Sequence, residues 1–236
     1  MTKCWSIVPA AGVGERMEIN RPKQYIEIAG KYIIEHSIAP LLQCKMIDAV
    51  VVALRKKDKY WQHTSISDDP RITVCEGGPS RAQSVRNALA QLKADAEDWV
   101  VVHDAVRPCL KTDTLKQFIK STWDNHPIGA IMAIAITDSI KHVQHNPIRG
   151  GFYIVSTLSR NDLWFRSATP QMFRYRLLCD ALDKALPDGF PIDDEAVAMM
   201  RSNHEVDVIL GDAQNIKITH REDLEYARRW LSYKKR

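Results

Sequence analysis

Continuous apolar runs alternate with segments of helical spacing over the first half of the chain. The runs that predict buried strands are CWSIVPA (4–10), MIDAVVVAL (46–54), RITVCEG (71–77) and DWVVVHDAVRP (98–108). Apolar positions recur at helical spacing in YIIEHSIAPLLQC (32–44), SRAQSVRNALAQLK (80–93) and TDTLKQFIKSTW (112–123). Apolar strands separated by amphipathic helices are typical of a largely parallel sheet with helices on both faces. The pattern therefore predicts an α/β fold.

This alternation stops after residue 128. Three strand-like runs (129–137, 139–144 and 151–159) follow one another without a helix, and HNPIRGG joins the last two. So short a link cannot connect parallel strands, so we predict an antiparallel β-hairpin arm over about 138–159. A two-stranded hairpin is marginally stable alone, and we expect this one to pack on something, for which a second subunit is a candidate.

The end of the chain returns to the α/β pattern. It predicts helices at 174–186, 194–202 and 221–236, with the strands VDVILG (206–211) and IKIT (216–219) between them. No linker, repeat or low-complexity segment interrupts the sequence. We therefore predict one Rossmann-like domain over residues 1–236, with the hairpin arm protruding from it.

Composition narrows the class of protein. A net charge of +4 with 26% charged residues is too mild for a nucleic-acid binder but suits an enzyme with a local basic pocket. The longest apolar run, IGAIMAIAI (128–136), is far shorter than the roughly 20 residues of a membrane helix. The five cysteines are scattered and odd in number, so we expect no disulfide framework and a cytoplasmic location.

The glycine-rich segment PAAGVGERM (9–17) follows the first predicted strand. It lacks the Gly-Lys-Ser/Thr of a P-loop, and a methionine stands where the dinucleotide fingerprint needs its third glycine. Its small residues still allow successive N–H groups to face an anion, and Arg16 and Lys23 add positive charge. The segment is either a polyphosphate-binding loop or a tight turn beside two solvated basic residues.

Asp104 stands where another apolar strand ends, in VVVHDAVRP. Parallel strands deliver polar residues to their carboxyl edge, where ligands bind, so Asp104 can face the glycine-rich loop. A single carboxylate there can hold Mg²⁺ that also bridges phosphates. The alternative is a turn residue whose ion-pair partner is Arg107.

Three further segments place polar groups at the ends of elements. GGPSRAQSV (77–85) puts Arg81 and Ser84 on the first turn of a predicted helix, a common cap that is weak evidence alone. DDEA (193–196) sets three carboxylates at a helix start. Lys217 lies between two isoleucines of the predicted strand IKIT, so it faces either a pocket or solvent.

Taken together, these segments resemble one family. PAAGVGERM with PKQY, then GGPSRAQSV, VHDAVRP, TPQ followed by Phe, DDEA and NIKIT occur in that order across nearly the whole chain. They resemble the 2-C-methyl-D-erythritol 4-phosphate cytidylyltransferase family, a family of nucleotidyltransferases in isoprenoid precursor synthesis. The resemblance implies transfer of CMP from CTP to methylerythritol phosphate, with Mg²⁺ as cofactor and release of pyrophosphate.

The resemblance also assigns residues to roles. It implies that the nucleotide is bound by Pro9, Ala10, Ala11, Gly12, Gly14, Gly78, Ser84 and Asp104, the last holding Mg²⁺. The implied catalytic residues are Arg16, Lys23, Arg160 and Lys217. Arg107, Ser139 and Thr169 match positions that bind the acceptor. In the family the arm crosses to a partner, so the resemblance implies a homodimer in which Ser139 and Arg160 serve the neighbour's site.

Three departures from the family pattern stand out. Pro79 follows the two glycines, Ser139 replaces the commoner threonine, and one extra residue lies between Arg160 and Thr169. The alternatives are a cytidylyltransferase for a pentitol phosphate such as ribitol 5-phosphate and a nucleotide-binding module without catalysis. A dinucleotide-dependent dehydrogenase is disfavoured by the missing third glycine.

Overall fold

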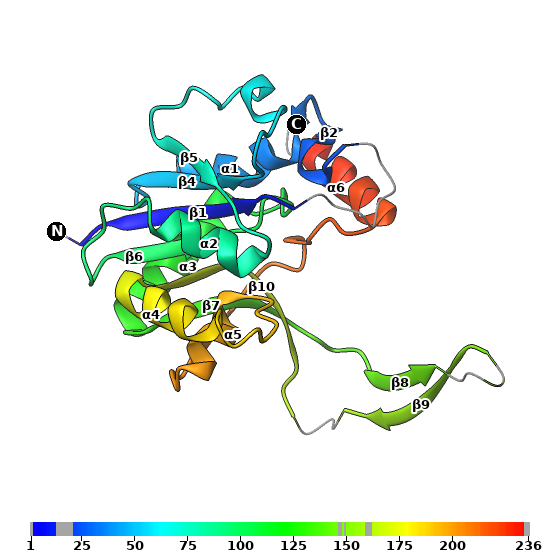
Figure 1. Cartoon of the computed structure of the whole chain (residues 1–236). Coiled ribbons are helices and arrows are strands. Elements are labelled where there is room, and N and C mark those ends of the chain that lie inside the picture. The colour runs from blue at the N-terminus through cyan, green and yellow to red at the C-terminus, as the bar shows by residue number, and fades with distance from the viewer. Residues whose placement is uncertain (1, 13–20, 146–147, 149, 159–161, 234–236) are drawn as a thin grey trace.

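A seven-stranded sheet in the order β11-β7-β10-β6-β1-β4-β5 forms the centre of the computed structural model (Figure 1). The structure describes residues 2–12, 21–145, 148, 150–158 and 162–233. The strands are β1 (Cys4–Ala10), β4 (Ala49–Leu54), β5 (Ile72–Glu76), β6 (Trp99–Val102), β7 (Gly129–Ala135), β10 (Phe165–Arg174) and β11 (Asp207–Leu210). β10 runs antiparallel to β6 and β7, whereas the other neighbouring pairs are parallel. The predicted mostly parallel sheet is confirmed.

Helices cover both faces of the sheet, as the alternating pattern predicts (Figure 1). One apolar core joins Val8 and Val50 to α1 (Ile33–Gln43) and α3 (Thr112–Asn125). The other core joins Ile7 and Val51, the chain neighbours of Val8 and Val50, to three helices. These are α2 (Arg81–Leu89), α4 (Tyr175–Ala185) and α5 (Glu195–Arg201). Successive strand residues point to opposite faces, so a continuous apolar strand supplies both cores.

Smaller elements complete the fold beside this sheet. They are η2 (Lys23–Tyr25), β2 (Glu27–Ile28), β3 (Lys31–Tyr32), η3 (Trp61–His63) and α6 (Arg221–Tyr233). Leu224 and Leu231 of α6 pack with Ile28 and Ile218 in a third apolar cluster. In the described residues no helix is long and apolar enough to cross a membrane. No disulfide bond joins any of the five cysteines, all of which lie in the described residues.

β10 is the strand that the sequence pattern missed. Thr169, Pro170 and Gln171 interrupt its apolar run, yet all three are buried. The pairing with β7 shifts register between Ser167 and Gln171, which is a bulge of the kind that redirects side chains beside functional sites. The segment therefore sits centrally in the sheet although its composition is that of a turn.

The predicted strand IKIT is wrong. Residues 215–219 form no strand, because the chain leaves the sheet after β11 and crosses toward α6. Ile218 anchors this crossing segment in the cluster with α6. Lys217 therefore projects from an irregular segment, and its direction does not follow from strand alternation.

The predicted hairpin arm is confirmed. β8 (Lys141–His145) and β9 (Phe152–Thr157) pair antiparallel and extend away from the body of the molecule (Figure 1). Every residue of both strands is exposed, including Phe152 at 74% and Ile154 at 60%. The arm therefore leaves several large apolar side chains exposed.

The order of the strands fixes where a ligand can bind. From β1 the chain moves outward through β4 and β5, then returns to β6 on the other side of β1. The topological switch point of the parallel strands therefore lies between the carboxyl ends of β1 and β6. Ala10 ends β1 and Val102 ends β6, so the glycine-rich loop and Asp104 open onto the same crevice.

Candidate active site at the carboxyl edge of the sheet

Two adjoining pockets open at this edge. We name the first the glycine-loop pocket; its volume is about 480 Å³, and its lining includes residues 9–12, 78–81 and 104–106. The second, the β10 pocket, has a volume of about 490 Å³, and its lining includes residues 166–169 with Arg107. Both volumes suit small-molecule ligands.

The glycine-rich loop lines the first pocket as expected, with Pro9, Ala10, Ala11 and Gly12 on its wall. Gln24 Nε2 donates hydrogen bonds to the carbonyl oxygens of Ala10 (2.8 Å) and Gly12 (3.1 Å). These oxygens would otherwise repel an anion, so the side chain of Gln24 favours phosphate binding by backbone N–H groups. Gly14 and Arg16, also expected here, lie outside the described residues.

A second glycine turn closes against this loop. A Cβ atom on Gly77 would lie 2.6 Å from Ala11 Cβ, so only glycine allows the two loops to approach so closely. Gly78 and Ser84 both line the pocket, and the Gly78 N–H donates to Ser84 Oγ at 3.0 Å. The Ser84 hydroxyl also donates to the Ser80 carbonyl at 2.9 Å. These two bonds hold the glycine turn at Gly78 against the start of α2.

Lys23 also lines the glycine-loop pocket, at the start of η2. Its Nζ donates to the Ile218 carbonyl oxygen at 3.0 Å. This bond joins the N-terminal part of the chain to the crossing segment 215–219 near the C-terminus. Lys23, which the resemblance implies to be catalytic, is therefore held at the pocket by a hydrogen bond to a backbone carbonyl 195 positions away.

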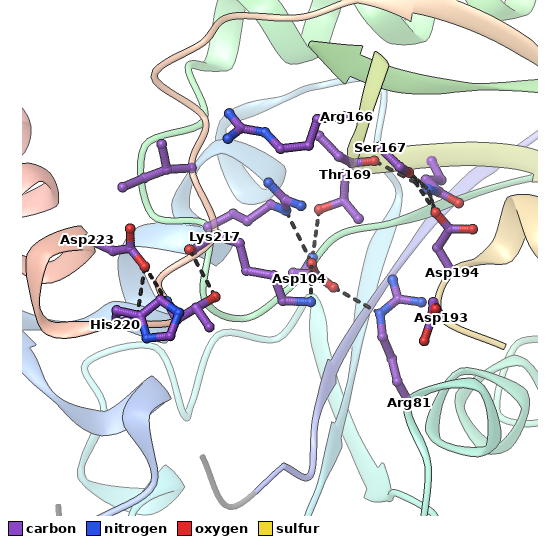
Figure 2. A pocket seen from close by; sticks show the side chains of 15 residues that line it. Arg81, Asp104, Arg166, Ser167, Thr169, Asp193, Asp194, Lys217, His220 and Asp223 are labelled. Carbon is purple, nitrogen blue, oxygen red and sulfur yellow. Dashed lines mark hydrogen bonds and ion pairs between the residues drawn. The ribbon is translucent and has the colours of Figure 1, made fainter. Parts of the chain in front are cut away.

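Asp104 lies at the centre of the site, surrounded by three cationic side chains (Figure 2). Arg81 Nε donates to its Oδ1 at 3.0 Å, and Arg107 Nε donates to its Oδ2 at 3.1 Å. Lys217 Nζ lies 3.2 Å from the same Oδ2. Burial alone would raise the pKa of Asp104, but the adjacent charges of these cations outweigh it and hold that pKa well below its ordinary value. The carboxylate is therefore charged at neutral pH.

The two pockets meet at this cluster. In the part of the chain that the structure describes, the lining residues common to both are Arg81, Asp104 and Lys217. These three side chains therefore border ligands in either pocket. The alternative interpretation of Asp104 is a turn residue paired with Arg107. That pair is present, but it does not account for the position of Asp104 between the two pockets.

Arg81 is held from its other side by Glu195, the first residue of α5. Its Nη1 and Nη2 donate to Glu195 Oε1 and Oε2 at 2.6 and 3.0 Å, a bidentate ion pair. Glu195 is 1% exposed, and burial raises the pKa of its carboxyl while the Arg81 charge opposes that rise. Arg81 therefore bridges two buried carboxylates, one from each side of the site.

Thr169, expected to contact the acceptor, lines the β10 pocket and joins it to the strand end. Its Oγ1 accepts from the Asp104 N–H at 3.0 Å and lies 3.0 Å from His103 Nδ1. His103 Nε2 lies 3.3 Å from the Arg107 carbonyl, which requires a donor and so places the ring proton on Nε2. Burial lowers the pKa of His103 to about 4, so the ring is neutral at pH 7 and accepts from the Thr169 hydroxyl.

Arg107 is also expected to bind the acceptor substrate. Its side chain is buried, yet it lines the β10 pocket. Its Nη1 donates to the Asn215 carbonyl at 2.9 Å, and Asn215 Nδ2 donates to the Thr169 carbonyl at 2.7 Å. Asn215 thus ties the crossing segment to β10. Ser139 is exposed near the base of the arm and lines neither pocket, and Arg160 lies outside the described residues.

Sequence reasoning assigned no role to several residues that the fold brings to the site. They are Gln24, Arg81, Glu195 and Asn215, each of which holds another site residue by a side-chain hydrogen bond. Arg81 and Glu195 belong to segments singled out in the sequence, GGPSRAQSV and DDEA. Their pairing across 114 positions was not visible in either segment alone.

The side chains at the site fit one mode of Mg²⁺ binding. Within the described residues no group of three or more His, Cys, Asp or Glu side chains could hold a metal. Asp104 is the carboxylate among the described residues lining the glycine-loop pocket, and three cationic contacts use most of its acceptor positions. One carboxylate with substrate phosphates is still a usual Mg²⁺ environment, so the residues fit an ion that phosphate oxygens largely coordinate.

Comparison with known proteins adds an independent line of evidence. The family model of 2-C-methyl-D-erythritol 4-phosphate cytidylyltransferase matches residues 4–233. A protein of that name from Photobacterium profundum is 42% identical over 224 residues, covering 94% of this chain and 93% of its own length. A Vibrio vulnificus relative of the same name is 40% identical and covers all of this chain and 97% of its own.

Solved structures show the same similarity. The crystal structure of Francisella tularensis 2-C-methyl-D-erythritol 4-phosphate cytidylyltransferase aligns with a TM-score of 0.83 at 32% sequence identity. The alignment covers 98% of this chain and 100% of that one. Sequence and fold therefore point to the same family over nearly the whole length.

Proposed function

The chain belongs to the 2-C-methyl-D-erythritol 4-phosphate cytidylyltransferase family, and we propose that it transfers CMP from CTP to methylerythritol phosphate in isoprenoid precursor synthesis. A phosphate oxygen of the acceptor forms a bond to the α-phosphorus of CTP. The bond from that phosphorus to the β-phosphate oxygen breaks, and pyrophosphate leaves with the electron pair. The observation that carries the proposal is the wall of three charged side chains between two adjoining pockets.

CTP is proposed to occupy the glycine-loop pocket. Loop N–H groups, with Arg16 and Lys23, would bind the triphosphate, and the turn at Gly78 and Ser84 would hold the ribose and base. Reactions of this type need no enzyme nucleophile, because positioning and charge stabilisation supply the catalysis. Lys23 is supported in this role by its place on the pocket wall and its backbone anchor.

Methylerythritol phosphate is proposed to occupy the β10 pocket. Arg107, Thr169 and Lys217 line it and would bind the acceptor, with Lys217 next to the transfer point because it faces both pockets. Arg160 is proposed to help aim the acceptor phosphate. The basic side chains of this pocket are the donors that a phosphate monoester requires.

A divalent cation, Mg²⁺, is proposed to accompany the triphosphate. Asp104 would supply its one protein carboxylate, and the ion would neutralise phosphate charge when bound. The cations around Asp104 keep that carboxylate ionised with or without the metal.

We further propose a cytoplasmic homodimer joined through the β-arm. The arm exposes Phe152, Tyr153, Ile154 and Val155, which a second copy of the chain would cover. Ser139 and Arg160 would then serve the neighbour's site. Five cysteines without a disulfide accord with a reducing compartment.

The test of the reaction is a matrix of nucleotides against acceptors, assayed by pyrophosphate release with Mg²⁺. We expect turnover with CTP and methylerythritol phosphate. Turnover with ribitol 5-phosphate instead would favour the pentitol-phosphate alternative. Nucleotide binding without turnover of any acceptor would favour the non-catalytic module.

The shared dimer site has its own test by complementation. Arg160→Ala and Lys217→Ala variants, each inactive alone, are mixed in equal amounts after partial unfolding and refolding. If the arm serves the neighbour, mixed dimers carry one intact site, and about a quarter of wild-type activity returns. No recovery, although cross-linking shows mixed dimers, would place Arg160 in its own chain's site.

A further inference from the structure

The wall between the two pockets contains one residue to which the proposed function gives no role. Of its three members, Asp104 and Lys217 have proposed roles toward the phosphates, whereas Arg81 has none. Its side chain, at the start of α2, is 19% exposed and lines both pockets. Figure 2 shows it reaching toward Asp104 from the side opposite Lys217.

We infer that Arg81 is a further catalytic residue of the transfer, binding the phosphoryl group that passes between the pockets, and that Glu195 is its positioning residue. The inference rests on the proposed function, since it assumes that a phosphoryl group crosses this wall. It adds a substrate contact from the first turn of α2 and a support for that contact from α5.

The hydrogen bonds of Arg81 leave it able to bind a phosphate. A guanidinium has five N–H donors, and the two carboxylates engage one on each nitrogen of Arg81: Nε toward Asp104, Nη1 and Nη2 toward Glu195. Two N–H groups remain on a side chain that lines both pockets. Donors that are already oriented need no rearrangement when charge develops on a phosphoryl group, which is the condition for strong electrostatic catalysis.

Glu195 fixes the plane of this guanidinium. Both of its oxygens are engaged by Arg81, and at 1% exposure its carboxylate has no access to water as an alternative partner. α5 is itself fixed at the site, because its N-cap Asp194 accepts from the Val197 N–H and also from Ser167 of β10. The position of Arg81 is therefore set jointly by the sheet edge and by α5.

The proposed step involves no proton transfer by Arg81. As the acceptor oxygen bonds to the α-phosphorus and pyrophosphate leaves, its free N–H groups would bind the non-bridging oxygens of the phosphoryl group in transit. A lysine has one point charge and cannot hold Glu195 in a bidentate pair while also serving Asp104 and a phosphate. Arg81→Lys therefore keeps the charge and removes the geometry.

The same helix offers a matched control. Arg86 of α2 also forms a bidentate pair with a carboxylate, donating to Asp183 at 2.6 and 2.9 Å. It lines neither pocket, since it faces α4 rather than the sheet edge. Arg81→Lys and Arg86→Lys thus make the same chemical change on one helix, and only the first makes it at the wall.

The experiment compares these two variants with the wild type by pyrophosphate release, varying CTP and methylerythritol phosphate separately, together with thermal unfolding. We expect Arg81→Lys to lower kcat by about 100-fold with both KM values within about threefold. Arg86→Lys should keep wild-type kcat. A kcat of Arg81→Lys equal to that of Arg86→Lys would overturn the inference, whatever the unfolding temperature. No turnover by the wild type would overturn the proposed function itself, and this inference with it.

Glu195→Gln provides the second variant, which decides the matter if Arg81→Lys does not fold. The amide keeps the size of the side chain but cannot accept two hydrogen bonds from the guanidinium in the same way. Because Arg81 remains present but less well oriented, we expect kcat to fall by about 10-fold with unchanged KM values. Wild-type kcat in Glu195→Gln would remove the positioning role. A rise in both KM values without a change in kcat would mean that the pair only shapes the pockets.

Discussion

The two pockets are built in different ways although they share a wall. The glycine-loop pocket is formed mainly by short segments that directly follow β1, β5 and β6, with small side chains and backbone groups on its surface. The β10 pocket is lined mainly by polar and charged side chains from β10, from the residues just before α5 and from the crossing segment 215–219. The first depends on local turns at one sheet edge, and the second depends on distant segments meeting.

Because of this difference, the two pockets suit different kinds of ligand. Backbone N–H groups and one or two basic residues suit a polyphosphate, whose charge is spread over many oxygens. Individually placed side chains such as Thr169 and Arg107 can distinguish one small polyol phosphate from another. Substitutions in the first pocket should therefore change the rate of transfer, and substitutions in the second should change the affinity for the acceptor.

The largest expected effect tests the glycine-loop side. Lys23→Ala should lower kcat by about 100-fold or more, because a charge-stabilising donor is lost from the triphosphate site. The KM for methylerythritol phosphate should change little, since Lys23 lines only the glycine-loop pocket. Lys31→Ala, on β3 and outside both pockets, is the control. Steady-state kinetics in both substrates measure the effect, and near-wild-type kcat would exclude Lys23 from catalysis.

The same contrast explains how much could be predicted from the sequence. The sheet, the covering helices, the arm and the glycine-loop residues follow from local patterns, because apolar runs and turn residues report on their own surroundings. β10 and the route of Lys217 do not. TPQ looks like a turn until its partners β6 and β7 bury it, and IKIT alternates like a strand although Ile218 packs on α6 instead.

Pairs between distant segments were equally hidden. Arg81 with Glu195 and Asn215 with Thr169 depend on the completed fold, and neither partner carries a local signal for the other. Sequence resemblance compensated for part of this gap, because it placed Thr169 and Lys217 in the site without explaining how they reach it. It gave nothing for the residues that hold them in place.

The second effect concerns the stability of the β10 side. His103 has a folded-state pKa of about 4, below its ordinary 6.5, because burial disfavours its charged form. Between these values the unfolded chain binds more protons, so stability is fully present above pH 6.5 and falls as the pH is lowered toward 4. We expect the titration of His103 to lower the free energy of unfolding by about 2 kcal/mol when the pH falls from 7.5 to 5.

Urea unfolding at these two pH values measures the loss, and His103→Asn should reduce it. At pH 5 the folded His103 is still mostly neutral, so the hydrogen bond with Thr169 should persist and the KM for the acceptor should not follow this titration. An equal loss of stability in His103→Asn would assign the pH dependence to other groups.

A smaller effect is expected from Thr169→Val, which keeps the shape of the side chain and removes its hydroxyl. The Asp104 N–H and His103 Nδ1 would both lose their partner in a buried site. We expect the KM for methylerythritol phosphate to rise by about 10-fold while the KM for CTP stays unchanged. Thr169→Ser retains the hydroxyl and should restore most of the affinity. Equal changes in both KM values would show that the two pockets do not bind their substrates independently.

The smallest effect tests how far the β10 pocket extends toward solvent. Arg166 lines its rim, and within the described chain its guanidinium has no hydrogen bond or ion pair, unlike Arg81 and Arg107. An exposed charge contributes little through water, so Arg166→Ala should raise the KM for the acceptor only about threefold and reduce its dependence on salt. Arg176→Ala, which removes another exposed arginine, on α4, should change neither quantity. If kcat fell instead of acceptor affinity, Arg166 would belong with the wall residues, and the division between a rate-setting pocket and an affinity-setting pocket would fail at its outer edge.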